Sequence, residues 1–134
     1  MSGGRVELIR SAELAAAPYA QACIAHDATR LVFTAGACPL DADGATVSVG
    51  DVSGQTEQVM VNLRTALAAA GAHLTDVVKT TVYVASPRRE DLHAAWAVVR
   101  GHFGNHEVPS TLLGVSVLGY ADQLVEVEAI AALG

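Results

Sequence analysis

The sequence is poor in charge, in aromatic side chains and in lysine. Charged residues make up 16% of the 134 residues, aromatic residues make up 4%, and Lys79 is the only lysine. The net charge is −6, from eight basic and fourteen acidic residues. Proteins that bind nucleic acid usually carry a basic patch or stripe, whereas the basic cluster here is the pair Arg88-Arg89. This composition argues against a nucleic-acid partner.

Long apolar runs, metal motifs and paired cysteines are lacking as well. No apolar run reaches the roughly 20 residues that span a bilayer, so no membrane partner is expected. Residues 1–5 do not begin the apolar segment of a signal peptide, so no secretory signal is expected either. Cys23 and Cys38 form no CxxC pair, and free thiols in a reducing cytoplasm are the expected state. The sequence places no base or positive charge beside Cys38 that would lower the pKa of its thiol, so an activated nucleophile is not predicted there. The five histidines show no metal-ligand spacing, so no metal site is predicted.

Apolar side chains, in contrast, are abundant. Hydrophobic residues make up 51% of the chain, and the mean hydropathy is +0.36. That is apolar for a small chain, whose surface is large relative to its volume. We interpret the surplus as surface buried between subunits, and we expect a single domain over residues 1–134 that forms an obligate oligomer.

Hydrophobic periodicity and turn residues predict six strands and two helices. Asp51 or Ser53 caps the first helix, and Gly71 is its stop. Ser86-Pro87 opens the second helix in the favoured order of cap then proline, and this helix ends near Gly104. The second and third strands are expected to form a hairpin through the turn 27–30. The predicted strands are residues 6–9, 20–26, 31–35, 77–84, 111–117 and 123–131.

This order of elements predicts an α+β fold, a mixed sheet with both helices on one face. Two helices cover only one face of a sheet, so the other apolar face must be buried elsewhere. Closed symmetric oligomers bury such a face. A pocket between subunits, lined by strand ends and loops, then becomes the natural place for chemistry.

Two carboxylates interrupt the last predicted strand. Glu126 and Glu128 alternate there with Val125, Val127 and Ala129, so both point to one face, roughly 7 Å apart along the strand. A carboxylate pair in so apolar a strand is a candidate for acid–base or water-positioning chemistry.

Several segments resemble one known family. Residues 108–115 and 124–131 together resemble the C-terminal end of the RidA (YjgF/YER057c/UK114) family of enamine/imine deaminases. The resemblance covers nearly the whole chain and also includes, in order, the segments 18–21, 33–36, 51–71 and 76–84. It implies a chorismate-mutase-like fold, assembled as a homotrimer with three clefts between subunits, and no metal or organic cofactor.

The resemblance also implies a set of site residues. In deaminating relatives an arginine two positions after the proline binds the substrate carboxylate through a bidentate pair, and Thr111 stands at that position here. Tyr19 and Glu128 match a tyrosine and a glutamate that position substrate and water. Ala37 replaces a glutamine, and Trp96 falls about where many members have an asparagine. The implied catalytic residue is Glu128, and the implied substrate-binding residues are Tyr19, Gly36, Ala37, Trp96, Ser110, Thr111 and Leu113.

Each of these residues also has a plainer interpretation. Glu128 is alternatively a carboxylate held by an interface hydrogen bond, and Glu126 is predicted to be structural or exposed. Tyr19 is alternatively a packing residue beside Pro18. Trp96 falls in an apolar helical stripe, which favours core packing. Thr111 suits strand geometry without any ligand.

Three functions follow as hypotheses. The first is hydrolytic deamination of an enamine or imine in the inter-subunit clefts, with water oriented by Glu128 and developing charge stabilised by backbone N–H groups near Leu113. Because Thr111 replaces the arginine, the expected ligand is a more apolar or uncharged small molecule, and a typical 2-imino acid deaminase is not expected. The alternative is a non-catalytic trimer that binds a small metabolite. The lowest-ranked hypothesis is an endoribonuclease, which the acidic balance disfavours.

Overall fold

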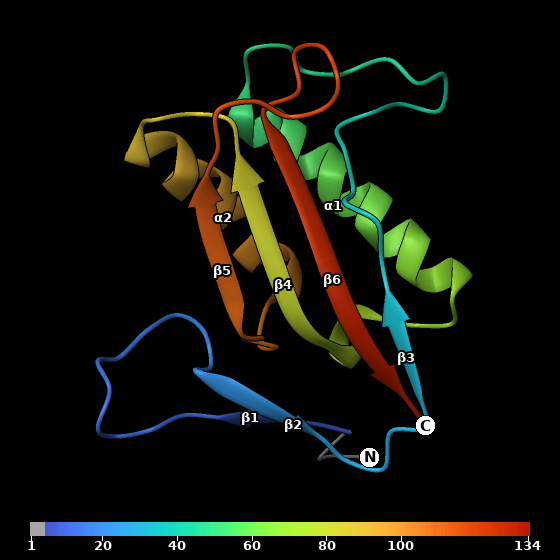
Figure 1. Cartoon of the computed structure of the whole chain (residues 1–134), viewed down its shortest axis with the longest axis vertical. Helices are drawn as coiled ribbons and strands as arrows, with labels where there is room; N and C mark the ends of the chain where they lie inside the picture. Colours follow the sequence, from blue (N-terminus) through green and yellow to red (C-terminus); the bar gives the residue numbers. More distant parts are fainter. Residues whose placement is uncertain (1–4) are drawn as a thin grey trace.

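The computed structural model describes residues 5–134 and shows a four-stranded mixed sheet in the order β3-β6-β4-β5 (Figure 1). Residues 1–4, which include most of the segment used to argue against a leader, lie outside the described residues. The sheet strands are β3 (Arg30–Phe33), β4 (Val77–Val84), β5 (Ser110–Gly114) and β6 (Val125–Leu133). β6 is antiparallel to both β3 and β4, and β5 is parallel to β4.

Both helices cover the same face of the sheet, behind it in Figure 1. They are α1 (Val52–Ala69) and α2 (Arg89–Phe103), and the 3-10 helix η1 (Leu74–Asp76) leads into β4. The core lies between these layers and contains fully buried side chains such as Leu63, Leu67, Val82 and Val127. The predicted α+β architecture with two helices on one face of a mixed sheet is therefore confirmed.

The first helix begins and ends as the sequence predicts, whereas the second begins later than predicted. Asp51 caps α1 by accepting a hydrogen bond from the Gly54 amide at 3.0 Å, and Gly71 follows this helix with a φ of 81°. The second helix begins at Arg89, two residues later than Ser86-Pro87 predicts. Ser86 instead accepts from the Arg88 amide and donates to Asp91, so it holds the turn before the helix while Arg88 occupies the cap position.

The predicted hairpin between the second and third strands is wrong. β2 (Ala22–Ala25) pairs with β1 (Val6–Ile9) in a separate two-stranded sheet, and β3 pairs with β6. This β1–β2 hairpin lies beyond the end of the main sheet where β4 and β5 begin (Figure 1), and the Cys23 thiol contacts the Val78 carbonyl at 3.1 Å. The short turn at 27–30 looked like a hairpin loop because alternation identifies strands without identifying their partners.

The last two strands also have different limits from those predicted. β5 ends at Gly114 rather than residue 117, because its partner β4 ends at Val84, which pairs with Gly114. β6 starts at Val125 and runs to Leu133, two residues past the predicted end, because Leu133 still pairs with Arg30 of β3.

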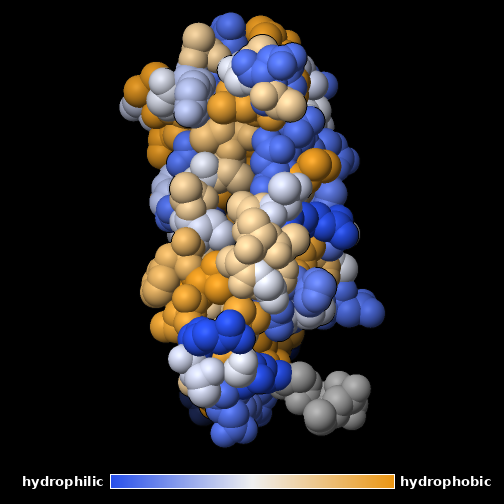
Figure 2. Space-filling view, turned by 90° about the vertical axis from the view of Figure 1, so that its right-hand side faces the viewer, coloured by the Kyte–Doolittle hydropathy of each residue, from blue (hydrophilic) through white to orange (hydrophobic). Residues whose placement is uncertain are grey.

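The sheet face opposite the helices is open and partly apolar. Alternation places Leu31 and Phe33 of β3 and Leu113 of β5 on this face, and they are 57%, 69% and 42% exposed. Figure 2 views the molecule from the right-hand side of Figure 1, along the β3 edge of the sheet, and shows hydrophobic patches divided by hydrophilic residues on that side. Neither helix among residues 5–134 is long and apolar enough to cross a membrane. The open face is therefore a partly apolar surface that the helices leave uncovered.

Candidate functional site

Polar side chains gather on the open sheet face where β4 and β6 lie side by side. In the antiparallel register Thr81 pairs with Glu128 and Tyr83 pairs with Glu126. Glu128, Lys79 and Thr81 line a shallow cavity of about 210 Å³, together with Phe33 and Ile130. The alternation that buries Val82, Val84, Val125 and Val127 against the helices turns these polar residues to the opposite side.

Glu128 is held by a phenol from the neighbouring strand. The Tyr83 hydroxyl donates to Glu128 Oε1 at 2.5 Å. This hydrogen bond is the main reason why the pKa of Tyr83 lies above its usual value, and burial and the nearby carboxylates add to the rise. Tyr83 therefore stays a hydrogen-bond donor throughout the neutral range, and it orients one oxygen of Glu128.

Thr111 is linked to the same cavity through Lys79. The Lys79 ammonium donates to Thr111 Oγ1 at 2.6 Å, across the parallel pair β4–β5. On the helix side of the same strands, Thr80 donates to the Ser110 hydroxyl at 2.7 Å. The two adjacent β5 residues predicted to bind substrate thus face different sides: Thr111 faces the open side, whereas the Ser110 hydroxyl is occupied by Thr80.

Gly36 and Ala37 lie beside Glu126, the carboxylate that the sequence predicts to be structural or exposed. Ala37 and Val127 exchange backbone hydrogen bonds of 2.7 and 3.2 Å, so the chain after β3 stays next to β6. A Cβ added at Gly36 would lie 2.0 Å from Glu126 Oε2, so only glycine permits this approach. Gln123 donates to Glu126 Oε1 at 3.1 Å. Glu126 is thus packed and hydrogen-bonded within the chain.

The Cys38 thiol also contacts this carboxylate, at 3.5 Å from Glu126 Oε1. Burial first, and then the charge of Glu126 and the hydrogen bond to it, raise the pKa of Cys38 to about 11. The thiol therefore stays protonated at neutral pH and is a poor nucleophile, as the sequence predicts.

Tyr19 and Trp96 meet at the β5 edge of the sheet. Their rings pack edge to face with centroids 6.2 Å apart. Together with Ser110, Thr111 and Leu112 they line a hollow of about 480 Å³. Trp96 also packs against the hydrophobic core, so the core-packing and pocket-wall interpretations both describe it. Thr111 joins this hollow to Lys79 and, through it, to the Glu128 cavity.

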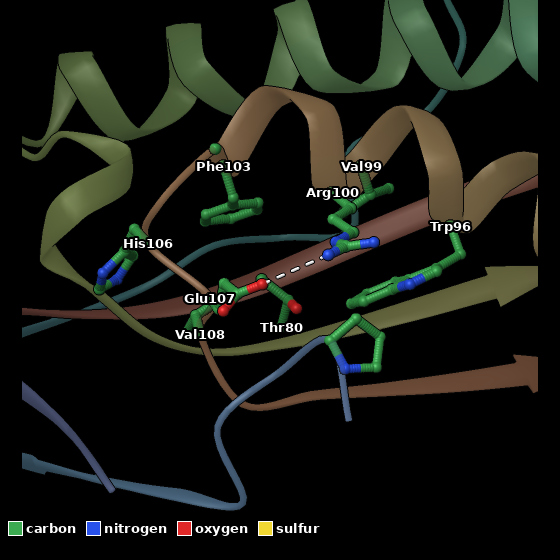
Figure 3. A pocket seen from close by; sticks show the side chains of 10 residues that line it. Thr80, Trp96, Val99, Arg100, Phe103, His106, Glu107 and Val108 are labelled. Atoms are coloured by element: carbon green, nitrogen blue, oxygen red, sulfur yellow. Dashed lines mark hydrogen bonds and ion pairs between the residues drawn. The ribbon is translucent and has the colours of Figure 1, made fainter. Parts of the chain in front are cut away.

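Beneath α2, a narrow cavity is lined by the ion pair of Arg100 and Glu107 (Figure 3). The Arg100 and Trp96 side chains extend from α2 toward the strands, and Arg100 pairs with Glu107 at 3.5 Å. Arg10 pairs with the same carboxylate at 2.6 Å. This network ties the loop before β2 to the segment that leads into β5.

The structure brings the predicted residues together in two groups and adds two that the sequence analysis missed. Tyr19, Trp96 and Thr111 share one hollow, whereas Gly36 and Ala37 lie with Glu126. Leu113 is exposed on the open face and pairs with Tyr83. The missed residues are Lys79 and Tyr83. Their alternation along one strand could have signalled a shared polar face, but not that this face lies against Glu128 and Thr111.

Comparison with known proteins finds one protein family and several relatives that match most of the chain. The family model described as endoribonuclease L-PSP matches residues 10–133. A RutC family protein of Pyrococcus horikoshii is 37% identical over 114 residues, which cover 85% of this chain and 86% of that protein. A human 2-iminobutanoate/2-iminopropanoate deaminase is 28% identical over 117 residues, covering 87% of this chain and 81% of the enzyme.

A solved structure is also similar to this chain over nearly its whole length. The crystal structure of YyfB from Yersinia pestis, a protein of unknown function of the conserved Rid protein family, superposes with a TM-score of 0.90 at 28% identity. The match covers 96% of this chain and 99% of that one. The similarity therefore extends over the main sheet, both helices and the β1–β2 hairpin.

Proposed function

This chain belongs to the endoribonuclease L-PSP family, which is the RidA family that its sequence resembles, and we propose on that basis that it hydrolyses small enamines or imines. The observation that carries this proposal is the carboxylate of Glu128, which lies in an open cavity with one oxygen held by Tyr83 at 2.5 Å. A carboxylate oriented through one oxygen leaves the other available to a water molecule.

The reaction needs only water and proton transfer. As the water oxygen bonds to the imine carbon, Glu128 takes one water proton and passes it to the imine nitrogen, which gives a carbinolamine. Glu128 then takes the hydroxyl proton and returns it to the nitrogen while the C–N bond breaks. The products are a carbonyl compound and ammonia, and Glu128 ends as the carboxylate with which it began. General acid–base catalysis of this kind contributes about a hundred- to ten-thousandfold.

We further propose that the working form is a homotrimer with its sites between subunits. The open sheet face exposes Phe33 and Leu31, which is costly for an isolated chain and is relieved by self-association. Both hollows described above are shallow within one chain. A second copy would add walls and turn each hollow into a more enclosed pocket, the form that small-molecule sites usually take.

The test uses freshly formed imines from an amino-acid oxidase, with semicarbazide trapping to follow their loss. Glu128→Gln is compared with the wild type, and Glu126→Gln is the matched control because it changes a neighbouring carboxylate on the same face. We expect wild-type hydrolysis, a loss of about a hundredfold or more in Glu128→Gln, and little change in Glu126→Gln.

Other outcomes have distinct meanings. Loss in Glu126→Gln alone would transfer the water-positioning role to Glu126, next to Gly36. Hydrolysis unchanged in both variants would contradict carboxylate catalysis. A wild type that binds small metabolites without hydrolysing any imine would support the non-catalytic binding protein. RNA incubated with the same metal-free preparation tests the family's endoribonuclease description, and the net charge of −6 predicts no cleavage.

A further inference from the structure

Lys79 occupies an unusual place for the only lysine of this chain. It lies within β4 on the open sheet face, and it lines the Glu128 cavity beside the apolar side chains of Phe33 and Ile130. Lysine is depleted within strands, and an ammonium near apolar side chains needs polar partners. The partners of Lys79 therefore indicate what this position does.

Its hydrogen-bond partner is neutral. Lys79 donates to the Thr111 hydroxyl at 2.6 Å, and within residues 5–134 no carboxylate forms an ion pair with it. An ammonium has three N–H donors, so the hydroxyl occupies one and leaves two. The Thr111 contact fixes where the charge sits without neutralising it.

The position of Lys79 relative to Glu128 suits a small ligand. Lys79 pairs with Ile130, and Thr81 pairs with Glu128, so Lys79 and Glu128 are diagonal neighbours on one face. Diagonal neighbours on antiparallel strands lie about 7–8 Å apart. A small ligand with an anionic group at Lys79 therefore occupies the cavity that Glu128 also lines.

Two arginines near the sheet are already engaged. Arg30 donates to the Gly134 carbonyl at 3.0 Å, and Arg100 pairs with Glu107. The open face thus offers Lys79 as its cation without a charged partner among residues 5–134.

We propose that Lys79, held by Thr111, is the anion-binding residue of this site and selects small monocarboxylates. The inference rests on the proposed imine hydrolysis and extends it. It revises the expectation from the sequence that the ligand is uncharged. The positive charge that would bind an anion is supplied by Lys79 on β4, the strand next to Thr111. An ammonium is a point charge that lacks the fork geometry of arginine, so we expect modest affinity and tolerance of different chain lengths in the acid.

Binding is measured separately from turnover with 2-oxobutanoate, a stable carboxylate that contains no imine. Because Lys79 is the only lysine, lysine-selective ¹³C labelling gives one side-chain ε-methylene signal, which reports the site directly. We expect a saturable shift of this signal with 2-oxobutanoate and none with 2-butanone, its uncharged counterpart. The absence of a shift with 2-oxobutanoate in the wild type would overturn the proposal.

Variants provide the second readout, through fluorescence of the single tryptophan, Trp96. Lys79→Met should weaken 2-oxobutanoate binding by about ten- to a hundredfold, the range for a hydrogen bond to a charged group. Lys79→Arg keeps the charge and should retain binding. Unchanged affinity in Lys79→Met, with its oligomeric state intact, would also overturn the proposal.

The two proposals fail in different ways. If 2-oxobutanoate binds through Lys79 but no imine is hydrolysed, only the proposed reaction is wrong. If imines are hydrolysed and Lys79→Met leaves the KM for 2-imino acids unchanged, only the anion-binding role is wrong.

Discussion

The Tyr83 phenol donates a hydrogen bond of 2.5 Å to Glu128 Oε1 on the open sheet face. They come from adjacent strands, and their side chains reach each other because Tyr83 is the diagonal neighbour of Glu128 in the β4–β6 register. One carboxylate oxygen is thereby oriented by the fold itself. Mutation of Tyr83 tests this contact directly.

Tyr83→Phe should lower hydrolysis about tenfold while leaving the fold intact. The substitution removes the hydroxyl that orients Glu128 and keeps the ring, so the loss falls mainly on kcat rather than on KM. Steady-state kinetics on the imine substrate checks the prediction. An effect confined to KM would show that Tyr83 contacts the ligand instead of positioning the carboxylate.

The raised pKa of Tyr83 predicts a specific alkaline behaviour. The folded protein binds the phenolic proton more tightly than the unfolded chain does, so the resulting stabilisation is complete below the pKa of an unperturbed tyrosine, about 10, and is lost as pH rises through the folded value. Ultraviolet titration of tyrosinate should show one late-titrating tyrosine of the three. In Glu128→Gln this titration should shift to lower pH, because the carboxylate that opposes the phenolate is gone. An unshifted titration would contradict the contact.

Cys38 should react slowly with iodoacetamide at pH 8. Its pKa of about 11 leaves little thiolate at this pH. Glu126→Gln should accelerate the reaction because it removes the negative charge beside the sulfur, whereas Glu128→Gln should not. Mass spectrometry of the Cys38 peptide separates it from Cys23. Equal rates in the wild type and Glu126→Gln would indicate that burial alone protects the thiol.

Gly36→Ala should destabilise the protein and displace Glu126. The new Cβ would lie 2.0 Å from Glu126 Oε2, so the carboxylate or the backbone must move. Gly119→Ala is the matched control, since a Cβ there meets no atom within 4 Å. Thermal unfolding should show a lower Tm for Gly36→Ala, by several degrees for a loss of about 1–2 kcal/mol, and little change for Gly119→Ala. A Tm equal to that of the control would show that Glu126 moves aside freely.

Phe33→Asp should disrupt the proposed trimer. Phe33 is 69% exposed on the open face, where a partner subunit would bury it, and a buried unpaired carboxylate is unfavourable. Analytical ultracentrifugation should give three times the chain mass of 13.8 kDa for the wild type and a smaller species for the variant. Val117→Asp changes a residue that is 78% exposed in the loop after β5 and serves as the control. A monomeric wild type would refute the trimer.

Local patterns along the chain were enough to predict most of the elements. The predicted strands 6–9 and 77–84 coincide with β1 and β4, and the cap at Asp51 with the stop at Gly71 located α1. These signals are local, because they depend on backbone geometry and on which side chains share a face. Alternation along the last strand showed that Glu126 and Glu128 point to the same face of the sheet. The family resemblance followed from contiguous motifs.

The partners of those residues depended on the tertiary structure. Strand alternation does not encode register, so the sequence could not show that β3 pairs with β6 rather than β2, that Tyr83 reaches Glu128, or that Lys79 reaches Thr111. Each of these contacts joins residues at least 32 positions apart. The position of the charge on the open face, and with it the class of ligand we propose, comes from the packing of strands that are distant in sequence.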